Sequence, residues 1–225
     1  MNPVAGAAVA ADNMNPVLRA FNEGGFVMYV ILVLAVLVLI LIIERFMTLK
    51  SLRVDKKEFS DQVFKMIVGG DLRQAISYCD TKPTPLSNTV KSGLVQVMNK
   101  RPDEEVQVAM DAAVLREMPK LEGMTSFLAV LGNIAVLAGL LGTIIGMIGS
   151  FRAVSTADPA TKAQLLSEGI SHALNCTGFG LIVAILAILF YGLFQHMIQK
   201  SENEMIETSM SLLNLVASNR DKLRD

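Results

Sequence analysis

Three long apolar segments constrain this chain more than any other feature of its sequence. The first, residues 26–43, reads FVMYVILVLAVLVLILII and contains no charged residue over 18 positions, about the minimum length of a transmembrane helix. Residues 127–151 and about 170–194 form two further segments of about 25 residues, each long enough to cross a bilayer with some tilt. The sequence therefore predicts an all-α membrane protein with three transmembrane helices.

The amino-acid composition is typical of a protein that lies in a lipid bilayer. Hydrophobic residues make up 52% of the 225 residues, charged residues 18%, and the mean hydropathy is +0.47, which is too apolar for an ordinary soluble domain. The net charge of −1 lacks the basic excess that binding of nucleic acid requires. We expect Cys79 and Cys176 to be small packing residues in different compartments, without a disulfide between them.

Basic residues flank the apolar segments unevenly. Five follow the first segment closely, whereas only Arg19 precedes it, and only Arg152 and Lys162 lie between the other two segments. Because basic residues favour the cytosolic side, the N-terminus is expected outside and the C-terminus in the cytosol. The predicted parts are an outside segment at 1–21, transmembrane helices at 22–44, 127–151 and 168–195, a cytosolic helical region at 45–126, an outside loop at 152–167 and a cytosolic C-terminal helix at 196–225.

The cytosolic region is expected to be helical as well. Its apolar residues recur at helical spacing, as at Val106, Met110, Ala113, Val114 and Met118. Asp103 follows Pro102 and is predicted to cap a helix that continues through Leu121 into the second transmembrane segment, with a kink at Pro119. Residues 82–87, KPTPLS, are predicted to form a loop between helices.

The second and third segments carry small residues at helical spacing, whereas the first is Leu, Val and Ile all round. In the second segment the stripe consists of Gly139, Gly142, Gly146 and Gly149. In the third it consists of Ala173, Thr177, Gly180, Ala184 and Ala187. Glycine is costly in a helix, so such stripes indicate close approach of another membrane helix.

Two threonines lie on or beside these stripes. At 1.5 Å per residue, Thr143 is about 10 Å and Thr177 about 13 Å below the same end of the membrane, so the two hydroxyls are predicted at similar depth. A threonine in a membrane helix usually donates its hydroxyl proton to a carbonyl three or four residues back, and this alternative remains open for both.

Ionisable groups are missing from the interior of all three segments. Glu44, Arg152 and Glu168 only flank them, and His172, in the first turns of the third, is either an interfacial polar residue or a titrating group at the mouth of an ion path. Intramembrane ionisable groups normally carry the protons in pumps and motors. If this protein moves protons, the main carrier is expected to come from another chain.

Three motifs resemble those of the MotA/TolQ/ExbB proton channel family. Residues 133–147, NIAVLAGLLGTIIGM, are similar to the family's NxAPLLGLLGTVxGM, and residues 169–181, GISHALNCTGFGL, to its GIxEALxATAxGL. Residues 43–45, IER, match the end of the family's first span. Three spans with an outside N-terminus are similar to the TolQ/ExbB branch, since flagellar stators have four.

The resemblance implies a homopentameric ring in the cell inner membrane, with a periplasmic N-terminus, around a TolR- or ExbD-like single-span partner that carries an intramembrane Asp. It implies that Thr143 and Thr177 line the ion path, with His172 at its mouth. Four glycines are expected to pack helices at the pore: Gly139, Gly142, Gly146 and Gly180. No cofactor, metal or catalytic residue is implied.

Several positions depart from the family pattern. Val136 and Leu186 stand where proline is common, His172 where the family has Glu, and Gly178 where Ala is usual. The resemblance favours a proton-driven motor for import, envelope maintenance or gliding. Two alternatives stay open, namely a sodium-driven stator relative and a non-conducting membrane scaffold. An enzyme is not indicated, because the chain has no catalytic triad pattern, metal-spaced His/Cys cluster or phosphate-binding glycine loop.

Overall fold

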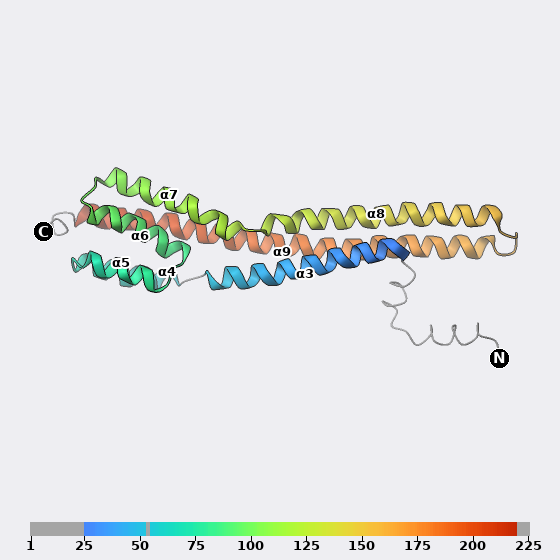
Figure 1. Ribbon diagram of the computed structural model, residues 1–225, viewed down its shortest axis with the longest axis horizontal. Coiled ribbons are helices and arrows are strands. Elements are labelled where there is room, and N and C mark those ends of the chain that lie inside the picture. Colours follow the sequence, from blue (N-terminus) through green and yellow to red (C-terminus); the bar gives the residue numbers. More distant parts are fainter. Residues whose placement is uncertain (1–24, 53–54, 220–225) are drawn as a thin grey trace, which may run out of the picture. The chain divides into compact units, whose positions relative to one another are not determined.

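The computed structural model describes residues 25–52 and 55–219, and every regular element in these ranges is an α-helix (Figure 1). The helices are α3 (Gly25–Ser51), α4 (Lys56–Val68), α5 (Leu72–Thr81), α6 (Pro85–Met98), α7 (Asp103–Glu122), α8 (Thr125–Thr156) and α9 (Lys162–Ser218). The predicted all-α class is confirmed. The segment predicted at 1–21 and the last six residues of the predicted C-terminal helix lie outside the described residues.

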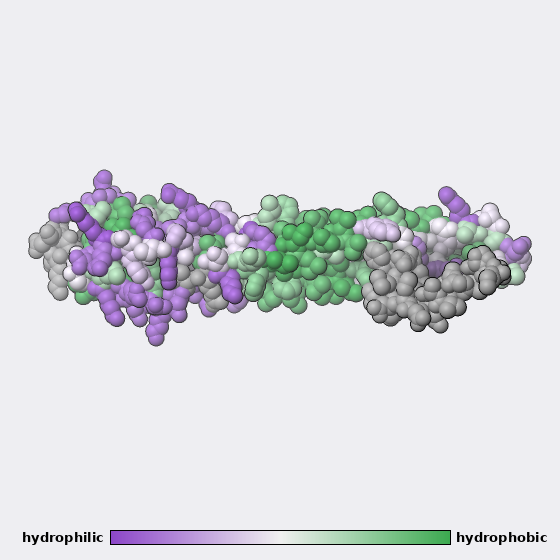
Figure 2. Space-filling model, turned by 60° about the horizontal axis from the view of Figure 1, so that its bottom comes forward, coloured by the Kyte–Doolittle hydropathy of each residue, from purple (hydrophilic) through white to green (hydrophobic). Residues whose placement is uncertain are grey.

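The described chain divides into two units. The apolar unit comprises residues 25–43 and 126–191, and the polar unit comprises residues 44–52, 55–125 and 192–219. Hydrophobic residues dominate the surface of the apolar unit, whereas hydrophilic residues dominate that of the polar unit (Figure 2). Helices α3 and α9 contribute to both units.

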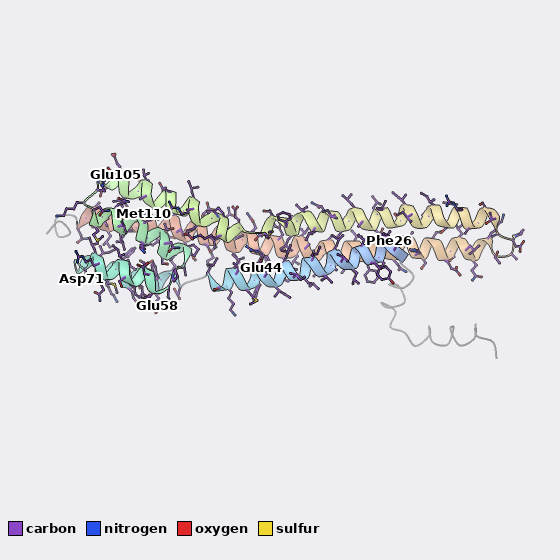
Figure 3. The ribbon with its side chains drawn as sticks, in the orientation of Figure 1. Phe26, Glu44, Glu58, Asp71, Glu105 and Met110 are labelled. Carbon is purple, nitrogen blue, oxygen red and sulfur yellow. The ribbon has the colours of Figure 1, made fainter. Side chains whose placement is uncertain are left out.

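Each of the three apolar segments, residues 26–43, 127–151 and about 170–194, lies within a helix long and apolar enough to cross a membrane, and residues 22–24 of the first predicted span lie outside the described residues. Only 28% of the most apolar 18-residue window in each of these helices is buried inside the chain. Phe26, labelled in Figure 3, is 82% exposed, and Leu137 and Ile185 are each 63% exposed. So much exposed hydrocarbon identifies a membrane protein, because lipid or other chains must cover it.

The core of the polar unit comes from amphipathic helices packed on the C-terminal part of α9. In α4 the residues Phe59, Val63 and Ile67 are spaced by four and all buried, which is why this segment forms a helix with one apolar face. Figure 3 labels Met110 on α7, which lies against Gly93 of α6; a Cβ atom on Gly93 would come within 2.6 Å of its sulfur. Glycine at this position thus lets α6 and α7 approach closely.

The segment predicted as a loop at residues 82–87 is mostly the start of α6. Thr84 is the N-cap of this helix, and its hydroxyl accepts a hydrogen bond from the backbone N–H of Ser87. The Ser87 hydroxyl oxygen in turn accepts from the backbone N–H of Thr84, and Pro85 occupies the first helical position. The predicted loop was therefore too long, since a proline that opens a helix has the same sequence signature as a turn.

The predicted helix across Pro119 is confirmed as far as Glu122, with the predicted apolar positions Val106, Met110, Ala113 and Val114 buried. Pro102 is the N-cap, so Asp103 is the first helical residue rather than the cap. The prediction that this helix continues unbroken into the second span is wrong. It ends at Gly123, whose φ of +42° is a conformation that a side chain strains.

Arg45 explains why the break occurs at a glycine. Its guanidinium group occupies the space that a Cβ atom on Gly123 would need. The Arg45 side chain is buried and held from the other side, because its Nε and Nη2 atoms donate to the Glu44 carboxylate at 2.5 and 2.7 Å. This contact joins the end of α7 to α3 within the polar unit.

Gly123→Ala is expected to destabilise the protein by more than about 1 kcal/mol, because it combines a strained φ with a collision against the buried guanidinium. Thermal unfolding in detergent, followed by circular dichroism, measures the loss. Gly70→Ala is the matched control, since Gly70 has a φ of +87° but no atom within 4 Å of its Cβ position. Equal melting temperatures for the two variants would show that the Arg45 contact contributes nothing.

The thiol of Cys79 gives a second prediction. Cys79 is buried in α5, and burial, followed by the negative charge of Asp80, raises its pKa to about 12. At pH 8 only about one thiol in ten thousand is then a thiolate, the form that reacts with alkylating agents. In a Cys176→Ser background, iodoacetamide should label the folded protein slowly at pH 8 and progressively faster up to pH 11.

Unfolding the same variant in denaturant is the control, because it should restore the reactivity of an ordinary thiol at pH 8. Mass spectrometry of the intact protein measures both rates. Equally fast labelling of folded and unfolded protein at pH 8 would contradict a buried, protonated Cys79.

Candidate ion pathway

Helices α8 and α9 approach each other through their small residues. A Cβ atom on Gly180 of α9 would lie 2.6 Å from the carbonyl oxygen of Ala135 in α8. One on Gly139 would lie 3.1 Å from both the Cys176 carbonyl oxygen and the Thr177 Cα atom. Backbone atoms rather than flexible side chains occupy these positions, so the two glycines permit a close contact that any other residue would obstruct.

The remaining glycines of the predicted stripe have different surroundings. A Cβ atom on Gly142 would lie 2.7 Å from that of Cys176 and 3.1 Å from Cγ1 of Val27, so α3, α8 and α9 meet at this position. At Gly146 the nearest atom, the Cβ of Ala173, is at an ordinary contact distance of 3.4 Å, and Gly149 has no neighbour within 4 Å. The surroundings of these α8 glycines therefore open from Gly142 towards Gly149, and α9 approaches α8 closely again at Ser150 and Gly169.

The two predicted pathway threonines lie at one level of this contact but make different hydrogen bonds. Thr143 donates to the carbonyl oxygen of Leu140 in its own helix at 2.6 Å, which is the ordinary backbone arrangement. Thr177 donates across the contact to the carbonyl oxygen of Gly139 at 3.1 Å. Because the two acceptors are consecutive residues of α8, the hydroxyl groups lie at similar depth, and Thr177 reaches its acceptor only where glycine brings the helices together.

A groove of about 730 Å³ lies along α8 and α9 at this end of their contact. Polar residues from both helices line it, namely Ser150, Ser167, Glu168, Ser171 and His172, together with Gly146 and Gly149. Ser150 donates to the carbonyl oxygen of Gly146 at 2.8 Å, and Gly169 leaves room for the Ser150 hydroxyl, which a Cβ atom at that position would strike. On α8 the groove reaches as far as Ile145, two residues from Thr143 in the sequence.

His172 lies at the edge of this groove and also contacts the start of α3. A Cβ atom on Gly25 would be 3.0 Å from its Nε2 atom, and its Nδ1 atom is 3.9 Å from the sulfur of Cys176. Glu168 is one helical turn earlier and lines the same groove. The structure thus brings His172 to the groove and Thr143 and Thr177 to the closest contact of the helices, about one and a half turns of α9 further along.

Sequence reasoning missed several residues here. Cys176 was predicted only as a packing residue, yet it lies at the junction of three helices beside Gly142 and His172. Glu168 was treated as a flanking residue and Ser150 was given no role in an ion path, although both line the groove. The spacing of four between Glu168 and His172 was a visible signal that the two share one face of α9.

These features define the chain as a membrane protein whose second and third apolar helices carry hydroxyl groups on a glycine-lined contact. The profile of the MotA/TolQ/ExbB proton channel family matches residues 81–207, more than half of the chain, and the chain belongs to this family. The matched residues include the contact between α8 and α9, both threonines and His172. The family predicted from the sequence motifs is confirmed.

Individual relatives place the chain near the TolQ/ExbB branch. It is 42% identical over 91 residues to the Tol-Pal system protein TolQ of Pseudomonas aeruginosa, a match that covers 40% of this chain and 39% of that protein. It is 30% identical over 177 residues to a putative biopolymer transport protein ExbB homologue of Methanothermobacter thermautotrophicus, covering 78% of this chain and 61% of the relative. The matches thus span less than two thirds of both relatives.

A third relative is matched over more of its length. The putative biopolymer transport protein ExbB-like 3 of Synechocystis is 27% identical over 173 residues, which cover 76% of this chain and 81% of the relative.

Gly180→Ala should loosen the contact between α8 and α9, because its methyl group would meet the Ala135 carbonyl oxygen at 2.6 Å. We expect a melting temperature in detergent several degrees lower, since about 1 kcal/mol shifts it by roughly 2–4 °C in a chain of this size. The control is Gly149→Ala, where the methyl group meets no atom within 4 Å and the better helix propensity of alanine should be neutral or stabilising. A similar loss in both variants would refute a tight contact at Gly180.

Proposed function

We propose that this chain is a TolQ/ExbB-like subunit of a proton-driven motor in the inner membrane. Five copies form a ring around the membrane helices of a TolR- or ExbD-like partner, with the N-terminus in the periplasm and the C-terminus in the cytosol. The observation that supports this best is the Thr143 and Thr177 level, where hydroxyl groups lie beside a glycine-lined contact between two apolar segments, residues 127–151 and 170–194, that contain no Asp or Glu. Family membership supports it independently.

The carboxylate that carries the proton belongs, in this proposal, to the partner helix. An ionised carboxyl group is expensive to place against the exposed apolar faces of α8 and α9, whereas a protonated one is much cheaper. Protonation from the periplasmic side therefore lets the partner helix move past the apolar surface. When the carboxyl group releases its proton on the other side, the ionised form again prevents this movement. Repeated around a ring, this cycle converts proton flow into mechanical work.

The polar groove supplies the entry to this path. His172 and Glu168 line it together with three serines, so water and protons can reach the Thr143 level through it. The imidazole ring of His172 has nitrogen atoms that can donate or accept a hydrogen bond, which suits a residue at the mouth of a proton path. Gly139, Gly142, Gly146 and Gly180 keep α8 and α9 together around this level.

The mechanical work is the import of nutrients across the outer membrane, the maintenance of that membrane, or gliding. The polar unit, formed by α4 to α7 and the C-terminal part of α9, extends the ring into the cytosol.

Thr177→Val tests the proposal, because valine keeps the shape of threonine and removes the hydroxyl that bonds to Gly139. In liposomes that contain the purified complex, we expect proton flux to fall about tenfold or more, the change that 1.4 kcal/mol in a barrier produces. Thr177→Ser keeps the hydroxyl and should retain most of the flux. Size-exclusion chromatography controls for assembly of the complex.

A change of the partner's intramembrane Asp to Asn should abolish flux in the same assay. Unimpaired proton flux in both that variant and Thr177→Val would count against the motor. Flux that follows an imposed sodium gradient after collapse of the proton gradient would indicate a sodium-driven relative. A native complex that conducts neither ion would indicate a scaffold.

A further inference from the structure

Asn133 is an exposed polar side chain within the apolar part of α8. It lies eight residues after the start of the helix at Thr125, and apolar residues on both sides of it are exposed, as Val130 and Leu137 are. Its carboxamide makes no side-chain hydrogen bond within residues 25–52 and 55–219. A primary amide facing hydrocarbon without a partner is strongly unfavourable, so this side chain needs a hydrogen-bonding group from outside the chain.

The position of Asn133 on the helix shows which face needs that partner. Counting from it by three, four, three and four residues gives a stripe of Asn133, Val136, Leu140, Thr143 and Met147. Val136 is 37% and Leu140 53% exposed, and Thr143 and Met147 are half-exposed, so α9 of the same chain leaves this stripe uncovered. The glycines that contact α9 lie on a neighbouring face of α8, about a quarter of a turn from the middle of this stripe, and Thr143 is the stripe residue nearest to them.

Asn133 therefore shares an open face with Thr143, a residue of the candidate ion path. The two are ten residues apart, which is about 15 Å along the helix. Between them the stripe is entirely apolar, with Val136 and Leu140 at its centre. A helix packed along this face would meet polar groups at two levels only.

We infer that Asn133 is a hydrogen-bonding contact for a membrane helix of a different chain, one that bears a carboxyl or hydroxyl group. This inference rests on the proposed function, in which such a helix packs beside Thr143. A carboxamide donates to an ionised carboxylate and accepts from a protonated carboxyl group, and it does not titrate itself. Asn133 thus provides a second polar contact, on the side of the membrane where α8 begins. There the partner's carboxyl group can pass its proton to water, and the amide can then donate to the resulting carboxylate.

A second copy of this chain fits this face less well than a different chain. Gly132 contacts Ala187 and Ile188, which places Asn133 at the level of residues 184–190 of α9. These residues read AILAILF and offer no hydrogen-bonding side chain, and the only one in residues 26–43 of α3 is Tyr29, near the start of that helix. The amide at position 133 would stay unpaired against these surfaces of another copy.

Photocrosslinking of the whole complex tests the contact. Benzoylphenylalanine in place of Asn133 is irradiated in native membranes, and the adduct is identified by mass spectrometry. The control is the same replacement at Ile134, which is 41% exposed at the same depth but turned by about 100° around the helix. We expect an adduct with a single-span chain from position 133 and little or none from position 134. An adduct with a second copy of this chain, or with lipid alone, overturns the inference.

Proton flux in liposomes gives the second measurement. Asn133→Leu should lower the flux of the purified complex about tenfold, equivalent to 1.4 kcal/mol in the barrier. Asn133→Ser, which keeps a donor and an acceptor, should retain more of the flux, and the amount of assembled complex should be unchanged in both. Full proton flux in Asn133→Leu overturns the inferred role of Asn133 as a polar contact for the partner's carboxyl group.

The two proposals fail in different ways. If the unaltered complex conducts no protons, the proposed function fails. If it conducts protons normally while position 133 crosslinks only to lipid, the proposed function stands and the role of Asn133 alone is rejected.

Discussion

The close approach of α8 and α9 is the interaction on which the apolar unit depends. At Gly180 and Gly139 backbone faces backbone, and a single added methyl group would meet a carbonyl oxygen or a Cα atom. Only this proximity lets the Thr177 hydroxyl bond to a carbonyl of the neighbouring helix instead of one of its own. In a bilayer, where burial of apolar surface does not drive helices together, such van der Waals contacts and interhelical hydrogen bonds hold them.

The same contact explains where polar groups gather. The α8 glycines lose their close neighbours towards Gly149, and serines, Glu168 and His172 line a groove at this end of the contact. The apolar segments 26–43, 127–151 and 170–194 contain no Asp or Glu, and most of their surface is exposed. In the proposed motor, hydroxyl and amide groups on an open face receive a proton carrier from another chain, which agrees with membership of a proton channel family.

Much of this arrangement was predictable because it follows from helical periodicity. The spacing of Gly139, Gly142 and Gly146 indicated a contact face, and the apolar spacing from Val106 to Val114 indicated the buried face of α7. The break at Gly123 was not predictable, since it depends on Arg45, a residue 78 positions earlier. The start of α6 was misjudged because two prolines and a Ser suggested a turn where Thr84 and Ser87 cap a helix.

The amino-acid order alone settles the number and length of the apolar helices and which faces carry small residues, because these properties repeat with the period of the helix. It also carries the family motifs, and with them the membership of a proton channel family. The tertiary structure decides which glycines are in contact, which threonine bonds across the helices, where the groove opens and that Asn133 is left exposed. Those outcomes depend on distances between atoms of different helices, and no local pattern along a chain specifies them.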